Sequence, residues 1–247
     1  MSDPLAGYAN RTGRPSGPLL RALGAVAPGV ASVRAQAEPY ADAWTAHNQA
    51  VLSSTGLLDR RPRWVVLGDS LAQGVGATVF DRGLVGQLER RLAAAGHGLD
   101  VVNLSATGAR VLDVLDQQVP LLAALTADLV TVVVGSNDLF GRPRHRRALP
   151  ASMSRLARAL PVGSVVATLP QPRRAAELAD RELEASARSG HLRLVDLRTS
   201  GPSSWRGLVA ADWFHPNDAG YAALADAFEP VLLAALDTTT GSASGVG

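Results

Sequence analysis

The sequence predicts a three-layer α/β/α domain built on a five-stranded parallel sheet, with a helical extension at its N-terminus. Three observations support this fold class. The chain has 247 residues, 47% of them hydrophobic and 19% charged, which suits one sizeable domain with an added segment. Short runs of Val, Leu and other apolar residues, some bounded by glycine, are typical of buried strands. Longer segments with helical periodicity separate these runs.

Five short apolar runs are the candidate strands, and a helical stretch follows each of them. The strands are expected at Trp64 to Leu67, Leu99 to Leu104, Leu129 to Val134, Val165 to Leu169 and Leu192 to Leu197. The helices are expected near Leu84 to Ala95, Val111 to Ala124, Ser152 to Leu160, Ala175 to Ser189 and Asp218 to Leu236. Strands that alternate with helices form parallel sheets with right-handed crossovers and helices on both faces. We therefore expect a flavodoxin-like fold in the main domain, residues 63–237.

Residues 1–62 are expected to form a tail and a helical extension. Residues 1–18 and 238–247 are rich in small and polar residues, which predicts two mobile or disordered tails. Between Tyr40 and Leu58, apolar residues recur on one side of a helix, so an amphipathic helix is expected to pack against the main domain. That stripe consists of Tyr40, Trp44 and Val51, with His47 or Asn48 beside them.

The segment "PLLRALGAVAPGVASVRAQAEP" has two interpretations. Arg11 and Arg14 precede an apolar stretch that closes on "AQA", which resembles a signal peptide with its cleavage site. Arg21, Pro28 and Gly29 interrupt that stretch and favour a helical appendage of the mature protein. We therefore expect a cytoplasmic protein, with secretion as the alternative.

The composition excludes several classes of site. The chain has no cysteine, so it holds no disulfide, thiolate metal site or cysteine nucleophile. Its formal net charge is only +2 and it carries no nucleic-acid-binding motif, so no nucleic-acid partner is expected. No run of 18 uninterrupted apolar residues is present, so no integral membrane segment is predicted.

The segments at one edge of the predicted sheet carry the parts of a catalytic site. Ser70 follows the first strand in "GDSLAQG", Gly108 follows the second in "SATGAR", and Asn137 follows the third in "GSNDLFG". Asp212 and His215 precede the last helix in "ADWFHPNDAG". Because ligands bind at the carboxyl edge of such sheets, we expect these residues to gather there. A nucleophile, a base, a carboxylate and oxyanion donors together indicate serine acyl transfer.

His215 is the best candidate for the base. A serine hydroxyl becomes a good nucleophile only when an imidazole removes its proton and a carboxylate holds that ring in the correct tautomer. Asp212, three residues earlier, can supply the carboxylate, and Pro216 disfavours helical geometry at His215. The competing histidines lie before predicted strands, in a basic loop or on the added helix: His97, His191, His145 and His47.

The oxyanion of a tetrahedral intermediate requires hydrogen-bond donors. The backbone N–H groups of Ser70 and Gly108 and the side-chain amide of Asn137 are the candidates. Structural roles remain open for each of them. Asp69 or Ser70 could cap the next helix, Gly108 could serve only a turn, and Asn137 or Asp138 could cap a helix or close an Asx turn.

Four short blocks make the chain resemble an SGNH hydrolase, the GDSL-type esterase and lipase superfamily. The blocks are "GDSL" at Gly68 to Leu71, "NLSATG" at Asn103 to Gly108, "GSND" at Gly135 to Asp138 and "DWFH" at Asp212 to His215. Each block alone is a weak signal, but four in the expected order are specific, and the resemblance covers Arg63 to Leu236. It implies that Ser70 is the nucleophile, that Gly108 and Asn137 donate to the oxyanion, and that Asp212 and His215 complete the triad.

The resemblance implies hydrolysis of a small acyl ester or a lipid ester without a metal or an organic cofactor. An acyltransferase would use the same triad on a sugar or lipid hydroxyl, and a non-catalytic binding module is a remote alternative. The acyl chain length, the natural alcohol and the oligomeric state stay open.

A cluster of arginines follows the third predicted strand in "FGRPRHRRALP". It consists of Arg142, Arg144, Arg146 and Arg147, with Arg110, Arg173 and Arg174 after neighbouring strands. The cluster is either a solvated charged loop or an electropositive mouth that attracts an anionic acyl substrate.

Overall fold

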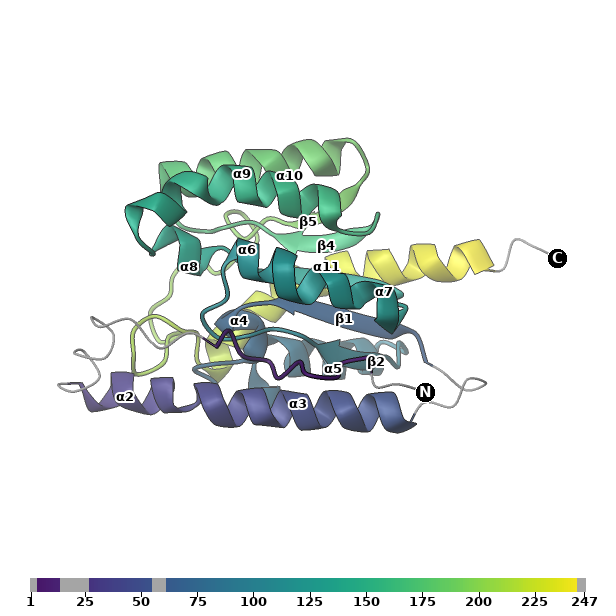
Figure 1. Cartoon of the computed structure of the whole chain (residues 1–247), viewed down its shortest axis with the longest axis horizontal. Helices are drawn as coiled ribbons and strands as arrows, with labels where there is room; N and C mark the ends of the chain where they lie inside the picture. The colour runs from purple at the N-terminus through teal and green to yellow at the C-terminus, as the bar shows by residue number, and fades with distance from the viewer. Residues whose placement is uncertain (1–3, 14–26, 55–60, 244–247) are drawn as a thin grey trace.

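A computed structural model describes residues 4–13, 27–54 and 61–243, which contain one sheet of five parallel strands (Figure 1). The strands are β1 (Arg63–Gly68), β2 (Asp100–Asn103), β3 (Leu129–Val133), β4 (Ser164–Ala167) and β5 (Leu192–Val195). Their order, β2-β1-β3-β4-β5, is that of flavodoxin-like folds. The predicted fold class is therefore confirmed. Each predicted strand except the first extends one or two residues beyond the carboxyl end of the observed strand.

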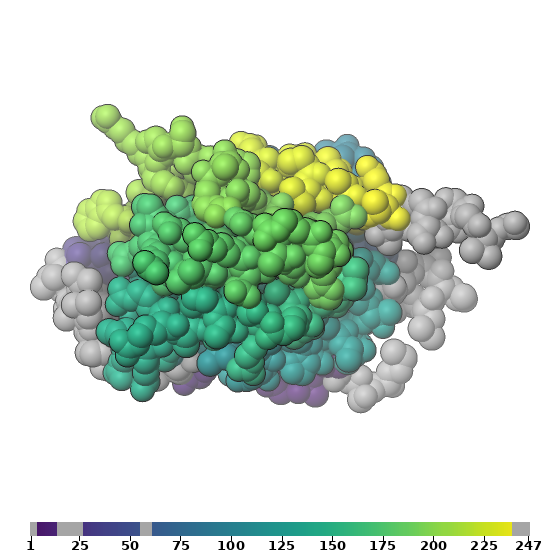
Figure 2. All heavy atoms as spheres, turned by 90° about the horizontal axis from the view of Figure 1, so that it is seen from above, coloured from purple at the N-terminus to yellow at the C-terminus, as the bar shows by residue number. Residues whose placement is uncertain are grey.

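Helices cover both faces of this sheet. The long ones after β1 are α5 (Leu84–Ala94), α9 (Pro143–Ala159), α10 (Arg174–Arg188) and α11 (Asp218–Ala243). In β1, Val65 and Leu67 belong to the core on the α9 and α10 side, while Trp64 and Val66 belong to the core on the α5 and α11 side. Figure 2 looks onto α9 and α10, which lie side by side over one face. The alternation along β1 thus produces two hydrophobic cores, one on each side of the sheet.

Two predicted helices differ from the observed ones. α9 begins at Pro143, nine residues before the predicted start. The prediction began too late because Pro150, which lies inside this helix, is typical of a helix break. The four arginines predicted in a loop therefore lie at the cap and in the first turns of α9. The predicted helix at 111–124 is divided into α6 (Val111–Asp113), the π-helical turn η2 (Val114–Gln118), η3 (Val119–Leu121) and α7 (Leu122–Leu125).

The N-terminal extension forms α2 (Pro28–Ala35) and α3 (Ala37–Ser54), and α3 runs along the edge strand β2 (Figure 1). Asn48 on α3 accepts a hydrogen bond from the Asn103 N–H at 2.9 Å and donates one to the Asn103 carbonyl at 2.8 Å. His47 Nε2 lies 3.1 Å from the carbonyl oxygen of Val101. These side chains occupy backbone groups that a further strand would otherwise pair with. The last predicted residues of this helix, 55–58, lie outside the described residues.

The predicted tails are partly wrong. Residues 4–13 pack on the domain: Leu5 is in the hydrophobic core, and the hydroxyl of Tyr8 donates to the carbonyl of Leu104. The buried amide of Asn10 donates to the carbonyl oxygens of Asn103 at 2.7 Å and Ser105 at 2.9 Å. At the other end, α11 continues through residues 238–243. Residues 1–3, 14–18 and 244–247 of the predicted tails lie outside the described residues.

Within the described part of the chain, one helix has the length and apolar composition to cross a membrane. It is the segment Asp218–Thr238 of α11, half of which is buried in the fold. Tyr221, Phe228 and Leu232 of this segment pack in the core beside α5. We interpret α11 as a core helix.

Candidate active site

The turn after β1 brings Ser70 to the carboxyl edge of the sheet. Gly68 has a φ of +150°, and a Cβ there would lie only 2.2 Å from the carbonyl oxygen of Val133, so this turn requires glycine. Asp69 caps the short helix α4 (Ser70–Gln73) by accepting the N–H of Leu71 at 3.0 Å. Ser70 is therefore the first residue of α4, and its N–H has no acceptor within that helix.

The loop from β5 to α11 brings Asp212 and His215 to Ser70. Asp212 Oδ1 accepts the N–H groups of Phe214 at 3.1 Å and His215 at 3.0 Å, which folds the loop back on itself. Asp212 Oδ2 lies 2.6 Å from His215 Nδ1, and His215 Nε2 lies 2.9 Å from Ser70 Oγ. Trp213, between them, adopts the left-handed region with a φ of +54°. The three candidate residues thus form one continuous hydrogen-bonded chain.

The electrostatics of this chain suit a base and its carboxylate. The side chains of Asp212 and His215 are 7% and 14% exposed. Burial alone raises the pKa of Asp212, but the hydrogen bond and charge of His215 outweigh it and lower that pKa below its ordinary value. An ionised Asp212 accepts a hydrogen bond from the N–H at Nδ1 of His215. Nε2 of the neutral ring then accepts a hydrogen bond from the Ser70 hydroxyl.

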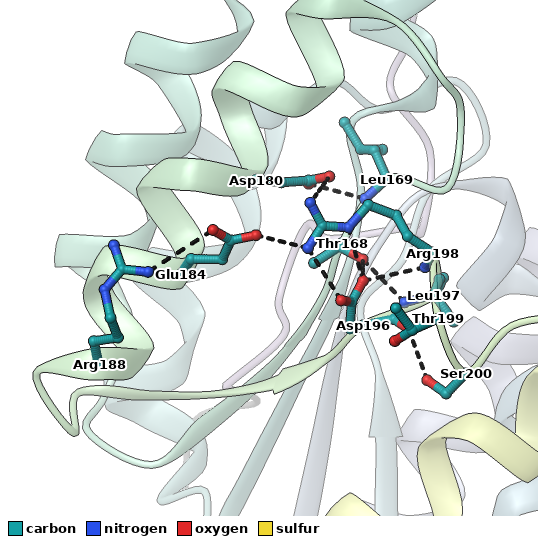
Figure 3. Close-up of polar contacts among 10 residues, drawn as sticks. All are labelled: Thr168, Leu169, Asp180, Glu184, Arg188, Asp196, Leu197, Arg198, Thr199 and Ser200. Carbon is teal, nitrogen blue, oxygen red and sulfur yellow. Dashed lines mark hydrogen bonds and ion pairs between the residues drawn. The ribbon is translucent and has the colours of Figure 1, made fainter.

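A cluster of charged side chains holds the start of the loop that carries Asp212 and His215 (Figure 3). Arg198 contacts Asp196 at 2.8 Å, Glu184 at 2.6 Å and the buried Asp180 at 3.7 Å, which joins the loop to α10. The hydroxyl of Thr168, after β4, donates to Asp196 at 3.0 Å. Burial raises the pKa of Asp180 to about 6 despite the opposing charge of Arg198. The cluster therefore fixes one end of the loop.

The candidate oxyanion donors lie on neighbouring turns. Gly108 adopts a φ of +81° in the turn after β2. Asn137 lies in α8 (Ser136–Leu139), and its amide nitrogen donates to the carbonyl oxygen of Ala109 at 3.0 Å and to Asp69 Oδ2 at 3.3 Å. Asn137 therefore connects the turns that follow β1, β2 and β3.

Two buried glutamines that we did not identify from the sequence hold these turns in place. Gln73 Oε1 accepts the N–H of Thr107 at 2.9 Å as well as its hydroxyl, and Gln73 Nε2 donates to the Asn10 carbonyl at 3.0 Å. Gln118 Oε1 accepts the N–H of Gly68 at 2.8 Å, while its amide donates to the Gly68 carbonyl at 3.0 Å. One glutamine thus supports the residue before Gly108, and the other supports the turn before Ser70.

Two further carboxyls are buried beside the site. Burial raises the pKa of Asp69 to about 7, and the nearby charge of Asp138 acts in the same direction. Burial also raises the pKa of Asp138 to about 6, although its Oδ2 accepts the N–H of Val111 at 3.0 Å. Asp69 caps α4 and Asp138 holds the start of α6, so both side chains support the loops.

The other histidines lie elsewhere in the described structure. His47 contacts β2, His191 Nε2 lies 3.1 Å from the carbonyl oxygen of Leu160, and His97 lies 3.9 Å from Asp237. His145 accepts from Arg144 on α9 at 3.3 Å. Among the described residues, no group of three or more His, Asp or Glu side chains could hold a metal ion.

Comparison with known proteins shows similarity to one family and to several solved structures. The family model for the GDSL-like Lipase/Acylhydrolase family matches residues 66–223. The crystal structure of TesA is similar at 25% identity and a TM-score of 0.57, covering 70% of this chain and 99% of that one. A family 3 carbohydrate esterase from Clostridium thermocellum shares the fold at 18% identity and a TM-score of 0.63, covering 72% of this chain and 98% of that one. The psychrotrophic esterase EstA from Pseudoalteromonas sp. shares the fold at 21% identity and a TM-score of 0.54, covering 71% of this chain and 98% of that one. No curated protein matches the sequence significantly.

Proposed function

The chain belongs to the GDSL-like lipase/acylhydrolase family, and from that premise we propose that it hydrolyses carboxylic esters through Ser70, His215 and Asp212. Esterase or lipase activity is the activity of the family. The observation that carries the assignment of residues is the unbroken chain from Ser70 Oγ through the imidazole to Asp212, with contacts of 2.9 and 2.6 Å.

In the first step, Ser70 Oγ attacks the acyl carbon of the ester while its proton passes to His215 Nε2. The carboxylate of Asp212 stabilises the imidazolium that forms. The tetrahedral intermediate then collapses, the bond to the alcohol oxygen breaks, and Nε2 delivers its proton to that oxygen. An acyl group remains on Ser70.

In the second step, water replaces the alcohol. His215 Nε2 removes a proton from the water as its oxygen attacks the acyl carbon, and it returns that proton to Ser70 Oγ when the acid departs. Every proton is carried by side chains, so this mechanism requires no metal and no organic cofactor. The substrate class is a small acyl ester or a lipid ester.

The oxyanion is stabilised by the N–H groups of Ser70 and Gly108 and by the amide of Asn137. The amide nitrogen of Asn137 donates to Asp69 Oδ2 at 3.3 Å, a longer contact than its hydrogen bond to the carbonyl oxygen of Ala109 at 3.0 Å. With a pKa of about 7, Asp69 is partly uncharged near neutral pH and is then a weaker acceptor. The oxyanion competes well for this hydrogen because it carries a full negative charge.

The test is hydrolysis of p-nitrophenyl esters by the Ser70→Ala variant. We expect loss of activity with a nearly unchanged thermal transition, because the hydroxyl is required for covalent chemistry and contributes little to packing. Ser105→Ala is the matched control, since its buried hydroxyl at the same edge has no hydrogen-bond partner among the described residues. Substantial activity in purified Ser70→Ala would exclude Ser70 as the nucleophile.

The same reaction distinguishes a hydrolase from an acyltransferase that uses this triad. An acceptor alcohol is added, and both the released acid and the newly formed ester are measured. When the acceptor is dilute and water is in large excess, a hydrolase releases mainly acid, whereas a transferase still forms mainly the new ester.

A further inference from the structure

Three exposed aromatic side chains lie beside the catalytic histidine. Phe140 is 46% exposed, Trp213 75% and Phe214 50%. The rings of Phe140 and Phe214 meet edge to face with centroids 5.6 Å apart, and the Phe214 ring meets the His215 imidazole in the same way at 5.0 Å. Exposed apolar side chains that gather in one place are typical of a binding surface.

Arg173 extends this surface with a positive charge. Its guanidinium carbon lies 4.9 Å from the centre of the Phe140 ring, over the ring face. Arg173 precedes α10, is exposed, and forms no ion pair with a carboxylate in the described part of the chain. Stacking on the ring restricts the guanidinium while its N–H groups stay available to an anion. The surface thus runs from His215 over two phenyl rings to a cation.

The chemistry of the reaction decides which part of the ester lies on this surface. His215 Nε2 delivers a proton to the alcohol oxygen, so the alcohol portion must lie on the histidine side of Ser70. The carbonyl oxygen lies toward Gly108 and Asn137, on the turns after β2 and β3. Phe214 contacts the imidazole, and Phe140 contacts Phe214. The aromatic pair therefore lies beside the group that protonates the alcohol oxygen, and we assign this surface to the alcohol portion.

We propose that Phe140 and Phe214 bind an apolar or aromatic segment of the alcohol portion, and that Arg173 binds a carboxylate or phosphate at the far end of that segment. This inference rests on the proposed esterase function and names its substrate class: esters of amphiphilic alcohols with an anionic group. It differs in two respects from the electropositive mouth, which is one of the two interpretations of the arginine cluster in the sequence. The charge acts on the alcohol rather than the acyl group, and of the arginines grouped in the sequence only Arg173 supplies it, without the four at the start of α9.

The test uses two esters that differ only in charge. One is para-carboxymethylphenyl acetate, and the other is the same compound with its carboxyl group methylated. A methylene group separates the carboxyl from the ring, so the two phenol leaving groups are nearly equal in reactivity. We expect the ratio of kcat/KM, anionic over neutral, to be on the order of tenfold at low salt, the lower range for a hydrogen bond between charged groups.

Arg173→Gln should reduce this ratio to about one. The matched control is Arg155→Gln, which removes an exposed arginine from α9 about 18 Å along the helix from its start at Pro143. The control should keep both the ratio and the activity. Phe140→Ala should raise KM for both aryl esters more than for ethyl acetate, which has no ring to place on the surface.

The inference is overturned if the wild-type enzyme has a ratio of kcat/KM, anionic over neutral, of about one. It is also overturned if Arg173→Gln has the same ratio as a wild type that prefers the anionic ester. Both outcomes leave the esterase function intact. Failure of the wild type to hydrolyse either ester contradicts the proposed function instead. In that case calorimetric binding of the product alcohol, para-hydroxyphenylacetate, still tests the surface. The wild type should bind it about tenfold more tightly than its methyl ester, and equal affinities overturn the inference.

Discussion

Replacing Gln118 by methionine should lower the free energy of unfolding by about 1.5–4 kcal/mol and reduce kcat as well. Gln118 Oε1 accepts the N–H of Gly68, and its amide donates to the Gly68 carbonyl. That carbonyl also accepts the N–H of Ala106 at 3.1 Å, so it keeps one partner after the substitution. Methionine is close to glutamine in size and offers no comparable donor or acceptor. The substitution therefore removes two hydrogen bonds with little change in volume.

The magnitude follows from the different consequences for the two backbone groups. The N–H of Gly68 is left buried without an acceptor, which costs about 1–3 kcal/mol. The carbonyl loses one of two bonds, which costs about 0.5–1 kcal/mol. Gln118→Ala adds a cavity and should cost at least about 1 kcal/mol more. Because Gly68 lies two residues before Ser70, a shift of this turn also displaces the nucleophile.

The assay is equilibrium unfolding in urea, monitored by circular dichroism, together with ester hydrolysis at saturating substrate. The midpoint should fall while the dependence on urea concentration stays the same. Gln117→Met is the control, because Gln117 is the exposed neighbour in the same turn and should change stability by less than about 0.5 kcal/mol. If Gln118→Met is equally harmless, the Gly68 backbone does not depend on this side chain and the reasoning is refuted.

Three other substitutions test the site and its loops. Asn137→Ala should lower kcat about 10²–10³-fold with little effect on KM, as expected for a donor that acts mainly in the transition state; a change in KM alone would assign Asn137 to substrate binding. Asp69 has a folded pKa of about 7 against an ordinary 3.8, so the folded state holds the extra proton between these values and stability falls as pH rises through that window. Thermal denaturation at about pH 5 and about pH 8 should show a smaller difference in Asp69→Asn than in the wild type, and an unchanged difference contradicts the assignment. Trp213→Asn should unfold at the same or a higher temperature, since asparagine tolerates the left-handed region better than tryptophan, whereas a large loss of stability would show that the indole is needed for packing.

The strands were predictable because their signal is local. A run such as "WVVL" is buried wherever it lies in the sheet, so composition alone finds it. Their carboxyl ends were placed too late because Leu104, Val134, Leu169 and Leu197 are buried in the turns that follow, and burial in a turn looks like burial in a strand. The prediction missed the N-terminal half of α9, because Pro150 inside the helix is typical of a helix break.

The candidate triad was predictable for a different reason, because four blocks in order resemble a known superfamily. The residues that support it were not. Gln73 and its partner Thr107 are 34 positions apart, and Gln118 and Gly68 are 50 apart. A buried glutamine leaves no periodic signal, and its partner is fixed only when the chain has folded. Asn10 was assigned to a tail for the same reason, although its carbonyl accepts from Gln73, 63 positions away.

The contact of α3 with β2 has a consequence for self-association. An edge strand with free N–H and carbonyl groups is a template for another copy of the chain, and covering it with a helix prevents that addition. Asn48 and His47 occupy such groups on Val101 and Asn103. A protein that began at Pro62, just before β1, would lose both side chains. Such a protein would keep its sheet but expose an open edge, and we expect it to pair edge to edge and form aggregates.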